Sequence, residues 1–354
     1  MERFRWHRLQ KAVTAAWSNK GPLARVLYPF SLLFRGIVLV RRRLYSHGIL
    51  KTERLKVPVI VVGNAVAGGA GKTPTVIAVV QYLRTHGFKV GVVSRGYGRI
   101  GTTCQEVLPD SLPRDVGDEP VLIQRLTQAC VFVASTRYAA AAALLAKYPL
   151  TDILVCDDGL QHYALYRDLE ICVFDDRGCG NGWLLPAGPL REPWPRRALR
   201  CAGQGDESLL VLHTGVRPAI SGFRARRSLS PVARRQDGTT VALSALSETT
   251  VKPLMAIAGI ATPESFFGML RANGLHLSQT LGLPDHYYFD SNISSISEGY
   301  SLICTDKDAV KLWAIVPSAW SVSLVFEPES AFFSALQDHL STIYPAQLSL
   351  TDGH

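Results

Sequence analysis

The chain has 354 residues, which is enough for one large or two medium domains with a sizeable buried core. Hydrophobic residues make up 47% and charged residues 19%, so the chain is neither a disordered protein nor a bundle of membrane spans. The seven cysteines are odd in number and form no CxxC pair, so we expect a reducing compartment and no zinc site.

Basic residues are concentrated at the N-terminus. The chain carries a formal net charge of +9, yet residues 1–56 alone hold thirteen lysines and arginines against two acids. The rest of the chain is therefore slightly acidic. A nucleic-acid-binding protein would spread its basic residues over a folded face, so this distribution argues against a nucleic-acid partner.

The N-terminal segment is apolar as well as basic. The run 26–40 is interrupted by Pro29 and Arg35 and is shorter than the roughly twenty residues of a bilayer span. It also lacks the cleavage site of a signal peptide. We expect an interfacial helix that offers Arg25, Arg35 and residues 41–43 to anionic head groups. The alternative is an ordinary helix packed on its own domain.

From residue 57 onward, short β-branched runs alternate with helical stretches, which predicts a parallel sheet covered by helices. The expected strands are 57–63, 89–94, 131–134, 152–158 and 169–175, and the expected helices are 73–87, around 119–128 and 137–147. A polar, β-prone stretch follows residue 216. Alternation then resumes with strand 254–259, helix 262–273, strands 300–305 and 321–326, and helix 329–340.

The stretch GNAVAGGAGKTP, residues 63–74, has the layout of a phosphate-binding loop (P-loop). Such a loop needs a strand, a glycine-rich turn, and then Lys and Ser/Thr at the start of a helix. Val66 stands where the strict pattern has glycine, so the loop is a variant, and a plain strand–helix turn is the alternative. We expect nucleotide binding by Gly68, Gly69, Ala70, Gly71, Lys72, Thr73 and Pro74, with the Thr73 hydroxyl as a Mg²⁺ ligand.

The stretch ILVCDD is an apolar strand that ends in two carboxylates, as in a Walker B motif. Asp157 is the better candidate for the magnesium site, and Asp158 is the neighbour that would orient water or substrate. A simple turn is the alternative, because DG is common in turns. His162 is either a site residue or a loop histidine.

Three further polar clusters precede or follow predicted elements. The stretch VSRGYGR places Arg95 and Tyr97 at the carboxyl edge of the sheet, where α/β proteins bind ligands. Asp118 precedes a helix, and capping is its default role. His286 lies in a loop with Asp285, and a lone loop histidine is usually inert.

Together these motifs resemble the tetraacyldisaccharide 4′-kinase (lipid A 4′-kinase) family. VGNAVAGGAGKTP, VSRGYGR, VGDEP, DDGLQHYALYRDLEI, LLPAGPLREP, LPDHYYF and TDKDAVK run in the family's order over roughly residues 15–330. The resemblance implies transfer of the γ-phosphate of ATP, with Mg²⁺, to the 4′-hydroxyl of a tetraacyldisaccharide 1-phosphate, giving lipid IVA. It also implies the cytoplasmic face of the bacterial inner membrane. The expected partners are this lipid and the membrane surface, without an obligate protein partner.

The resemblance also implies site residues. It assigns catalysis to Lys72, Asp118 and His286, and Mg²⁺ binding to Thr73 and Asp157. The expected substrate-binding residues are Arg95, Tyr97, Arg137, Asp158, Gln161, His162, Arg191 and Glu192. Leu160 and Asp306 depart from the Phe and Glu that the family often has.

The resemblance and the element pattern together predict an α/β protein with a P-loop NTPase-type parallel sheet, a second smaller α/β lobe and an N-terminal membrane-associated helix. The expected boundaries are 1–56 for the membrane-associated segment, 57–215 for the P-loop kinase lobe, 216–250 for a β-rich connection and 251–354 for the second lobe, which completes the site. Asp118 and His286 then fall on different lobes, so we expect their carboxylate–imidazole pair to assemble on lobe closure.

Three other classes fit less well. A membrane-associated P-loop ATPase with a positioning or assembly role is the main alternative, but its signature Lys would stand at Ala67. A GTPase would need an NKxD element, and TDKDA has Ala309 at the place of its last Asp. A soluble small-molecule kinase would have no need of residues 21–50.

Overall fold

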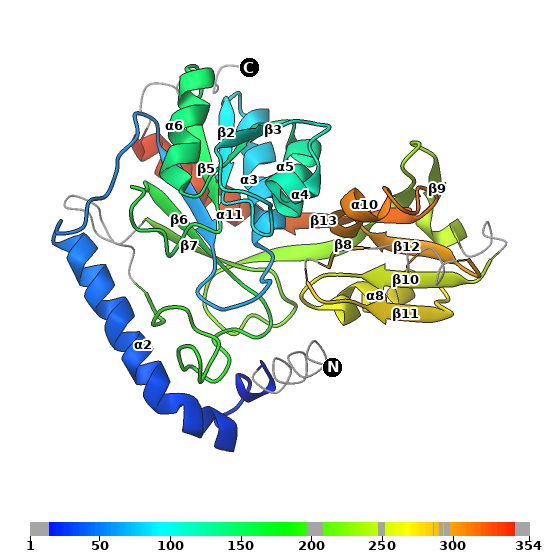
Figure 1. Cartoon of the computed structure of the whole chain (residues 1–354), viewed down its shortest axis with the longest axis horizontal. Helices are drawn as coiled ribbons and strands as arrows, with labels where there is room; N and C mark the ends of the chain where they lie inside the picture. The colour runs from blue at the N-terminus through cyan, green and yellow to red at the C-terminus, as the bar shows by residue number, and fades with distance from the viewer. Residues whose placement is uncertain are drawn as a thin grey trace. The chain divides into compact units, whose positions relative to one another are not determined.

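The computed structural model describes residues 14–196, 208–246, 252–285, 287–289, 293 and 298–343 (Figure 1). The chain packs as two compact units, each built from segments that are distant in sequence. The first unit comprises Met1–Val93, Arg137–Ala225 and Pro328–His354, and the second comprises Ser94–Thr136 and Arg226–Glu327.

The first unit holds a parallel sheet of short strands. They are β1 (Val59–Gly63), β2 (Val90–Ser94), β5 (Ile153–Asp157), β6 (Leu169–Phe174) and β7 (Leu209–His213). β1 lies between β5 and β6, β2 pairs with β5, and β7 pairs with β6. Every residue of β1, β2, β5 and β6 is buried, as a parallel sheet covered on both faces requires. The carboxyl ends of β1 and β5 therefore meet at one edge.

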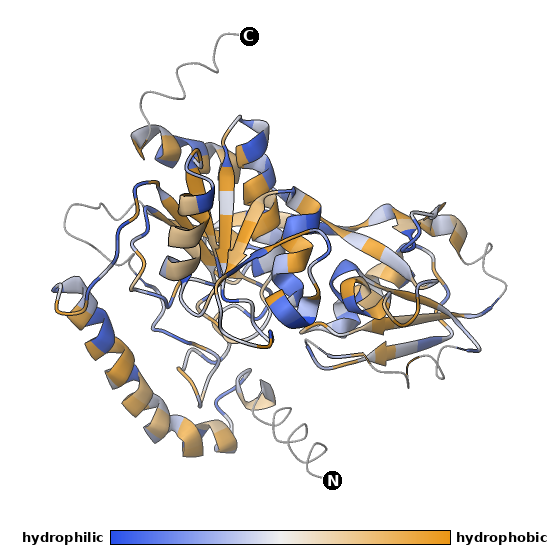
Figure 2. Cartoon of the chain, turned by 45° about the horizontal axis from the view of Figure 1, so that its top comes forward, coloured by the Kyte–Doolittle hydropathy of each residue, from blue (hydrophilic) through white to orange (hydrophobic). Residues whose placement is uncertain are grey.

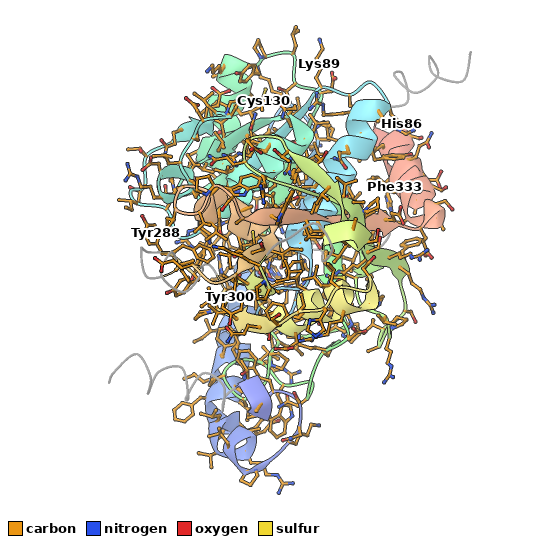
Figure 3. All side chains as sticks on the ribbon, turned by 90° about the vertical axis from the view of Figure 1, so that its right-hand side faces the viewer. His86, Lys89, Cys130, Tyr288, Tyr300 and Phe333 are labelled. Atoms are coloured by element: carbon orange, nitrogen blue, oxygen red, sulfur yellow. The ribbon has the colours of Figure 1, made fainter. Side chains whose placement is uncertain are left out.

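Helices α3 (Lys72–Thr85), α6 (Arg137–Lys147) and α11 (Ser330–Ile343) belong to this unit. α11 packs beside α3, where the rings of Phe333 and Tyr82 stack with their centroids 4.4 Å apart. Figure 3 labels Phe333 on α11 and His86, the residue that follows α3. α6 packs on β2, where Gly91 leaves room for Leu144. A Cβ at Gly91 would lie 2.7 Å from a Leu144 methyl group, which explains glycine there.

Helix α2 (Pro22–Ser46) runs along the outside of the first unit and begins with proline at its first turn, a favoured position for this residue. Ser31 Oγ donates to the Leu184 carbonyl at 2.7 Å, and the Tyr28 ring lies 4.3 Å from that of Trp183. The opposite side of the helix is apolar and exposed (Figure 2). By length and composition alone, α2 could cross a membrane.

The second unit holds another parallel sheet. Its elements are β10 (Leu254–Ala258), β11 (Gln279–Gly282), β12 (Ser301–Thr305), β13 (Trp320–Pro328), α8 (Pro263–Ala272) and α10 (Asp306–Leu312). β10 pairs with β11 and β12, and β12 pairs with β13. Alternate residues of β10 enter two cores: Ala256 packs in one with Phe266 of α8, and Ile257 packs in the other with Leu312 of α10.

Segment 94–136 completes the second unit. It contributes the antiparallel pair β3 (Gln105–Val107) and β4 (Cys130–Val133), and helices α4 (Pro113–Val116) and α5 (Asp118–Thr127). α5 contacts α10. Strand β8 (Phe223–Arg234) begins beside β7 in the first unit, continues in the second and pairs there with β9 (Thr240–Ala242), after which the 3₁₀ turn η1 (Leu243–Ala245) follows.

The α/β class, the P-loop-type parallel sheet, the second α/β lobe and the N-terminal helix are confirmed. The compact units nevertheless divide the chain differently from the expected boundaries. Residues 94–136, placed by composition in the lobe 57–215, pack with 226–327 instead. The boundary was mispredicted because α5 contacts α10. These two helices are almost two hundred residues apart, so no local sequence pattern indicates their contact.

Candidate active site

The loop after β1 has the backbone of a phosphate cradle. Gly68 and Gly71 adopt φ of 97° and 88°, values that favour glycine. Gly71 caps α3, so Lys72 is the first residue of the helix and Thr73 lies buried in its first turn. No side chain caps this end. Its backbone N–H groups are thus left for an anion, which a helix N-terminus favours.

Three side chains donate to carbonyl groups of the loop, one from within the P-loop motif and two from segments distant in the sequence. Asn64 Nδ2 donates to the Gly68 carbonyl at 3.0 Å, and Thr214 Oγ1 donates to the Ala70 carbonyl at 2.8 Å. Arg177 Nη2 donates to the Gly69 carbonyl at 2.9 Å. These three hydrogen bonds restrict the conformation of the loop.

The backbone pairing of the first half of the loop explains why valine stands at position 66, where the strict P-loop pattern has glycine. Val66 is buried and forms an antiparallel bridge with Leu190. The Ala67 N–H donates to the Pro189 carbonyl, and the Arg191 N–H donates to the Ala65 carbonyl, each at 2.7 Å. This stretch pairs like a strand, so its backbone has no need of glycine at Val66, and the segment LLPAGPLREP is fixed against the loop.

The two carboxylates after β5 lie beside this loop. Asp157 pairs in register with Val62 of β1 and is only 2% exposed. Asp158 follows with φ of 47°, a conformation uncommon outside glycine. Its carbonyl accepts from Arg137 Nη2 at 2.7 Å. The carboxylate Oδ1 of Asp158 lies 3.2 Å from Arg191 Nη1 and 3.8 Å from Lys72 Nζ. The structure thus brings Lys72, Arg137 and Arg191 into contact with Asp158.

The position of Glu192 differs from that of a substrate ligand. Its side chain is fully buried, and its carboxylate accepts from Gln161 Nε2 at 2.8 Å and from the Tyr163 hydroxyl at 3.0 Å. Arg196 and Arg42 pair with it at 2.7 and 3.3 Å. Burial, with the Glu192 charge next to it, raises the pKa of Tyr163. The geometry favours a structural role for Glu192 in place of the expected substrate contact, because protein donors already surround both of its oxygens.

Gln161 and His162 have different surroundings. Gln161 Nε2 also donates to the Asn64 carbonyl at 3.0 Å, so it links the start of the P-loop to Glu192. The backbone carbonyl of His162 accepts from the buried Arg167 at 2.6 Å. This contact fixes the turn after Asp158. It involves only the backbone of His162, so substrate binding by the His162 ring stays a prediction.

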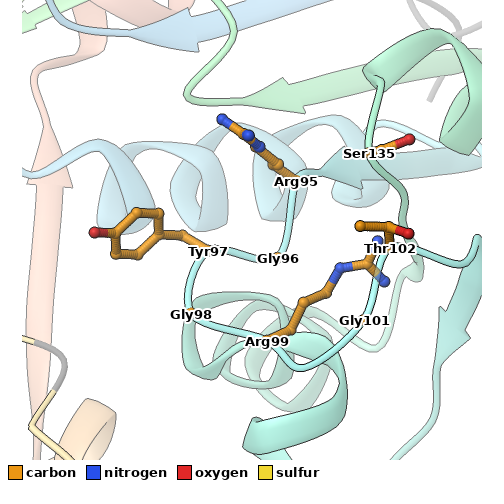
Figure 4. A pocket seen from close by; sticks show the side chains of 8 residues that line it. All are labelled: Arg95, Gly96, Tyr97, Gly98, Arg99, Gly101, Thr102 and Ser135. Atoms are coloured by element: carbon orange, nitrogen blue, oxygen red, sulfur yellow. The ribbon is translucent and has the colours of Figure 1, made fainter.

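Arg95 and Tyr97 line a pocket of about 290 Å³ in the second unit (Figure 4). Gly96, Gly98, Arg99, Gly101, Thr102 and Ser135 complete its lining, and none of these residues is acidic. Arg99 Nη1 donates to the Thr103 carbonyl at 2.7 Å, and burial lowers the pKa of the Arg99 guanidinium. Two guanidinium groups in a glycine-rich loop suit an anionic ligand.

Asp118 is the first residue of α5 and is 5% exposed. Gly117, rather than Asp118, occupies the N-cap position, so capping is not its role. The Asp118 carboxylate lies 3.1 Å from Lys311 Nζ. His286 lies outside the described residues.

The expectation that Asp118 and His286 sit on different lobes is wrong. Both sequence positions belong to the second compact unit, because 94–136 and 226–327 pack together. Lys307 Nζ lies 3.3 Å from Glu119, the residue after Asp118, and 2.9 Å from Asp285, the residue before His286. Lobe closure is therefore not needed to join these two motifs.

Sequence reasoning missed several residues that shape the site. Asn64 lies inside the P-loop motif and could have been noticed there. Arg177 and Thr214 come from loops more than one hundred residues away in the sequence, and no local pattern marks them. Lys307 and Lys311 lie within TDKDAVK, and the sequence alone indicates no role for these lysines.

Comparisons with known proteins agree with this geometry. A family model described as "LpxK: Tetraacyldisaccharide-1-P 4'-kinase" matches residues 23–341. A tetraacyldisaccharide 4′-kinase of Polaromonas naphthalenivorans is 53% identical over 98% of this chain and 99% of its own, and one of Acidovorax sp. is 50% identical over 95% and 96%. The crystal structure of LpxK from Aquifex aeolicus in complex with ATP superposes with a TM-score of 0.73 at 27% identity, covering 91% of this chain and 99% of that one.

Proposed function

Because the chain belongs to the tetraacyldisaccharide-1-phosphate 4′-kinase family, we propose that it transfers the γ-phosphate of ATP to the 4′-hydroxyl of a tetraacyldisaccharide 1-phosphate. The product is lipid IVA, a lipid A precursor. The observation that carries this proposal is the pair Asp157 and Asp158 at the end of β5, beside β1, with Lys72 Nζ 3.8 Å from the Asp158 carboxylate. That arrangement is what a P-loop phosphotransferase needs around the phosphate chain.

Thr73 and Asp157 fit a magnesium ion. Both supply hard oxygen donors, and Mg²⁺ is usually bound by one or two protein oxygens together with nucleotide phosphates and water. In the described ranges no three His, Cys, Asp or Glu side chains cluster as a metal site, and a nucleotide-assisted Mg²⁺ site does not require such a cluster. When bound, the ion would neutralise phosphate charge.

The chain's own residues perform the remaining steps. The N–H groups at the start of α3 bind phosphate oxygens. The Lys72 ammonium stabilises the negative charge that develops on the transferred phosphoryl group. Arg191 holds Asp158 in place. Asp118, with His286, removes the proton of the sugar hydroxyl, which is a poor nucleophile at neutral pH. Arg95 and Tyr97 bind the acceptor in the glycine-rich pocket.

Membrane binding by α2 is part of the proposal. Val26, Phe30, Leu33, Ile37 and Val40 recur every three or four residues, and each is 56% to 69% exposed. The opposite side is docked on the first unit through Ser31 and Arg42. A helix docked along its length on a water-soluble unit lies on the bilayer surface rather than across it. Because ATP is the donor, the surface is the cytoplasmic face of the inner membrane.

A transfer assay tests the function. The purified protein is incubated with γ-labelled ATP, Mg²⁺ and the tetraacyldisaccharide 1-phosphate in detergent, and the lipid is then extracted. We expect label in the lipid. The matched control is the same acceptor with its 4′-hydroxyl methylated, which should stay unlabelled. Release of labelled phosphate without any labelled lipid would favour the alternative, a membrane-associated P-loop ATPase.

A further inference from the structure

Two lysines of α10, Lys307 and Lys311, are one helical turn apart and therefore lie on the same side of the helix. Each contacts two motifs at once. Lys307 pairs with Glu119 and Asp285 at 3.3 and 2.9 Å. Lys311 pairs with Asp118 at 3.1 Å, and its ammonium lies 5.9 Å from the centre of the Phe289 ring. Each lysine thus joins VGDEP to LPDHYYF.

These contacts are shielded from solvent. The side chains of Lys307 and Lys311 are 16% and 11% exposed, and that of Asp118 is 6% exposed. Burial lowers the pKa of Lys307, but the carboxylates of Glu119, Asp285 and Asp118 prevail and hold it above its ordinary value. A buried ammonium among three carboxylates remains charged, so its contacts stay in place at neutral pH.

The helix that carries the two lysines is itself fixed to the sheet. Both carboxylate oxygens of Asp308 accept from the Gly259 N–H at 3.1 Å, just after β10. Thr305 caps α10 by accepting from the Asp308 N–H at 3.2 Å. Asp306, where the family often has Glu, accepts from Ser321 and from Arg234. α10 is therefore a rigid platform for Lys307 and Lys311.

We propose that Lys307 and Lys311 are positioning residues for phosphoryl transfer. Lys311 orients the Asp118 carboxylate directly, and Lys307 fixes the spacing between the residue after Asp118 and the residue before His286. The inference rests on the proposed function, because it assigns Asp118 and His286 to the base. A general base acts only within hydrogen-bonding reach of the proton it takes, and a small displacement of a reacting group costs much of the rate.

Lys307→Met tests the proposal in the full-length protein. We expect kcat to fall about 10- to 100-fold, in line with a misplaced catalytic group, while KM for ATP stays within about twofold because the P-loop is untouched. Lys307→Arg keeps the charge and should recover part of the loss. Lys252→Met is the matched control, since Lys252 is an exposed lysine of the same unit whose ammonium donates to the Glu298 carbonyl. It should leave kcat unchanged.

The pH profile separates positioning from a purely structural role. Glu119 and Asp118 on α5, Asp285 in the loop after β11 and Asp308 on α10 are the carboxylates that interact with Lys307. Removing its positive charge from this group favours the protonated form of the base. The acid limb of kcat against pH should therefore move upward in Lys307→Met and return towards wild type in Lys307→Arg.

Lys311 is tested with its partner. Lys311→Met should lower kcat, and adding it to Asp118→Ala should cost little more than Asp118→Ala alone, because residues that act as a unit are non-additive. Independent, multiplicative losses would overturn the role of Lys311.

The remaining outcomes are decisive. A folded Lys307→Met with unchanged kcat and pH profile overturns the role of Lys307, even if its melting temperature falls. If Lys307→Met does not fold, Asp285→Asn decides, since it breaks one ion pair and leaves Lys307 paired with Glu119. A drop in kcat of about tenfold supports the proposal, and an unchanged kcat overturns it. If the wild-type protein labels no lipid, the kinase function itself is contradicted. If the wild type is active and the variant is unaffected, only the positioning role is contradicted.

Discussion

At the residue scale, the site depends on a few charges placed close together. Lys72 and Arg191 both approach the Asp158 carboxylate, at 3.8 and 3.2 Å. Without nucleotide, Asp158 compensates the two cations. When a phosphate chain enters the loop, it offers Lys72 a stronger anionic partner than Asp158. Nucleotide binding can therefore replace the Lys72–Asp158 ion pair with a Lys72–phosphate contact.

Lys72→Ala should therefore lower transfer by about 100- to 1000-fold, the usual loss when one preorganised charge contact to the transition state is removed. The fold should survive, because the Asp158 carboxylate that pairs with Lys72 is partly exposed and can be solvated. Lipid labelling measures the rate, and circular dichroism checks the fold. A folded variant with full activity would exclude the P-loop assignment.

Asp157→Asn should raise the Mg²⁺ concentration for half-maximal activity by about tenfold or more. The amide keeps the shape of the side chain but removes the charge that a magnesium shell prefers. A magnesium titration of the labelling rate at saturating ATP measures this. Asp152→Asn, a change at a partly buried residue before β5 whose carboxylate accepts from the Lys89 N–H, is the control and should leave the magnesium dependence as in wild type.

At the scale of elements, a buried chain of charges ties α2 to the core. Arg167 pairs with Glu170 at 3.2 Å, and Arg196 pairs with both Glu170 and Glu192, at 2.6 and 2.7 Å. Glu192 then reaches Arg42 on α2. Because Gln161 also joins Glu192 to the start of the P-loop, one carboxylate supports both helix α2 and the P-loop.

Glu192→Ala should destabilise the protein by about 3–5 kcal/mol, because it leaves buried Arg196 without one of its two carboxylates. Thermal and urea denaturation would measure the loss. Glu53→Ala, which breaks an exposed pair with Lys51 at 2.7 Å, should cost less than about 1 kcal/mol. If Glu192→Ala instead kept its stability and only raised KM for the lipid, the substrate-binding role expected from the sequence would be right.

At the scale of the whole molecule, what could be predicted from the sequence was local. The P-loop and the Asp157–Asp158 pair each lie within a dozen residues, and β-branched strands with buried faces mark the elements around them. The division into units was not predictable in this way, since it depends on α5 meeting α10. Arg177 and Thr214, which bind carbonyl groups of the P-loop, could not be predicted for the same reason, because long-range hydrogen bonds produce no periodic pattern in the sequence.

Membrane attachment is the property of the whole molecule that α2 should determine. Deleting the helix would also remove Ser31 and Arg42, which contact the core, so point variants on its exposed side are the better test. Phe30→Ser, Leu33→Ser and Ile37→Ser together should weaken sedimentation with anionic vesicles by at least tenfold, because they remove the apolar surface that enters the acyl boundary. The apolar contribution is not screened, so the loss should persist at high salt.

Replacing Arg35 and Arg43 with Gln should act differently. Each basic residue near an anionic surface contributes roughly 1 kcal/mol, and this contribution fades with salt. The arginine variant should therefore bind more weakly at low salt and approach wild type at high salt. Leu150→Ser with Val216→Ser, exposed apolar positions of the first unit that are not part of α2, is the control for a general loss of surface hydrophobicity. Equal sedimentation of the α2 variants, the control and the wild type would mean that α2 is a packed helix with no role in membrane binding.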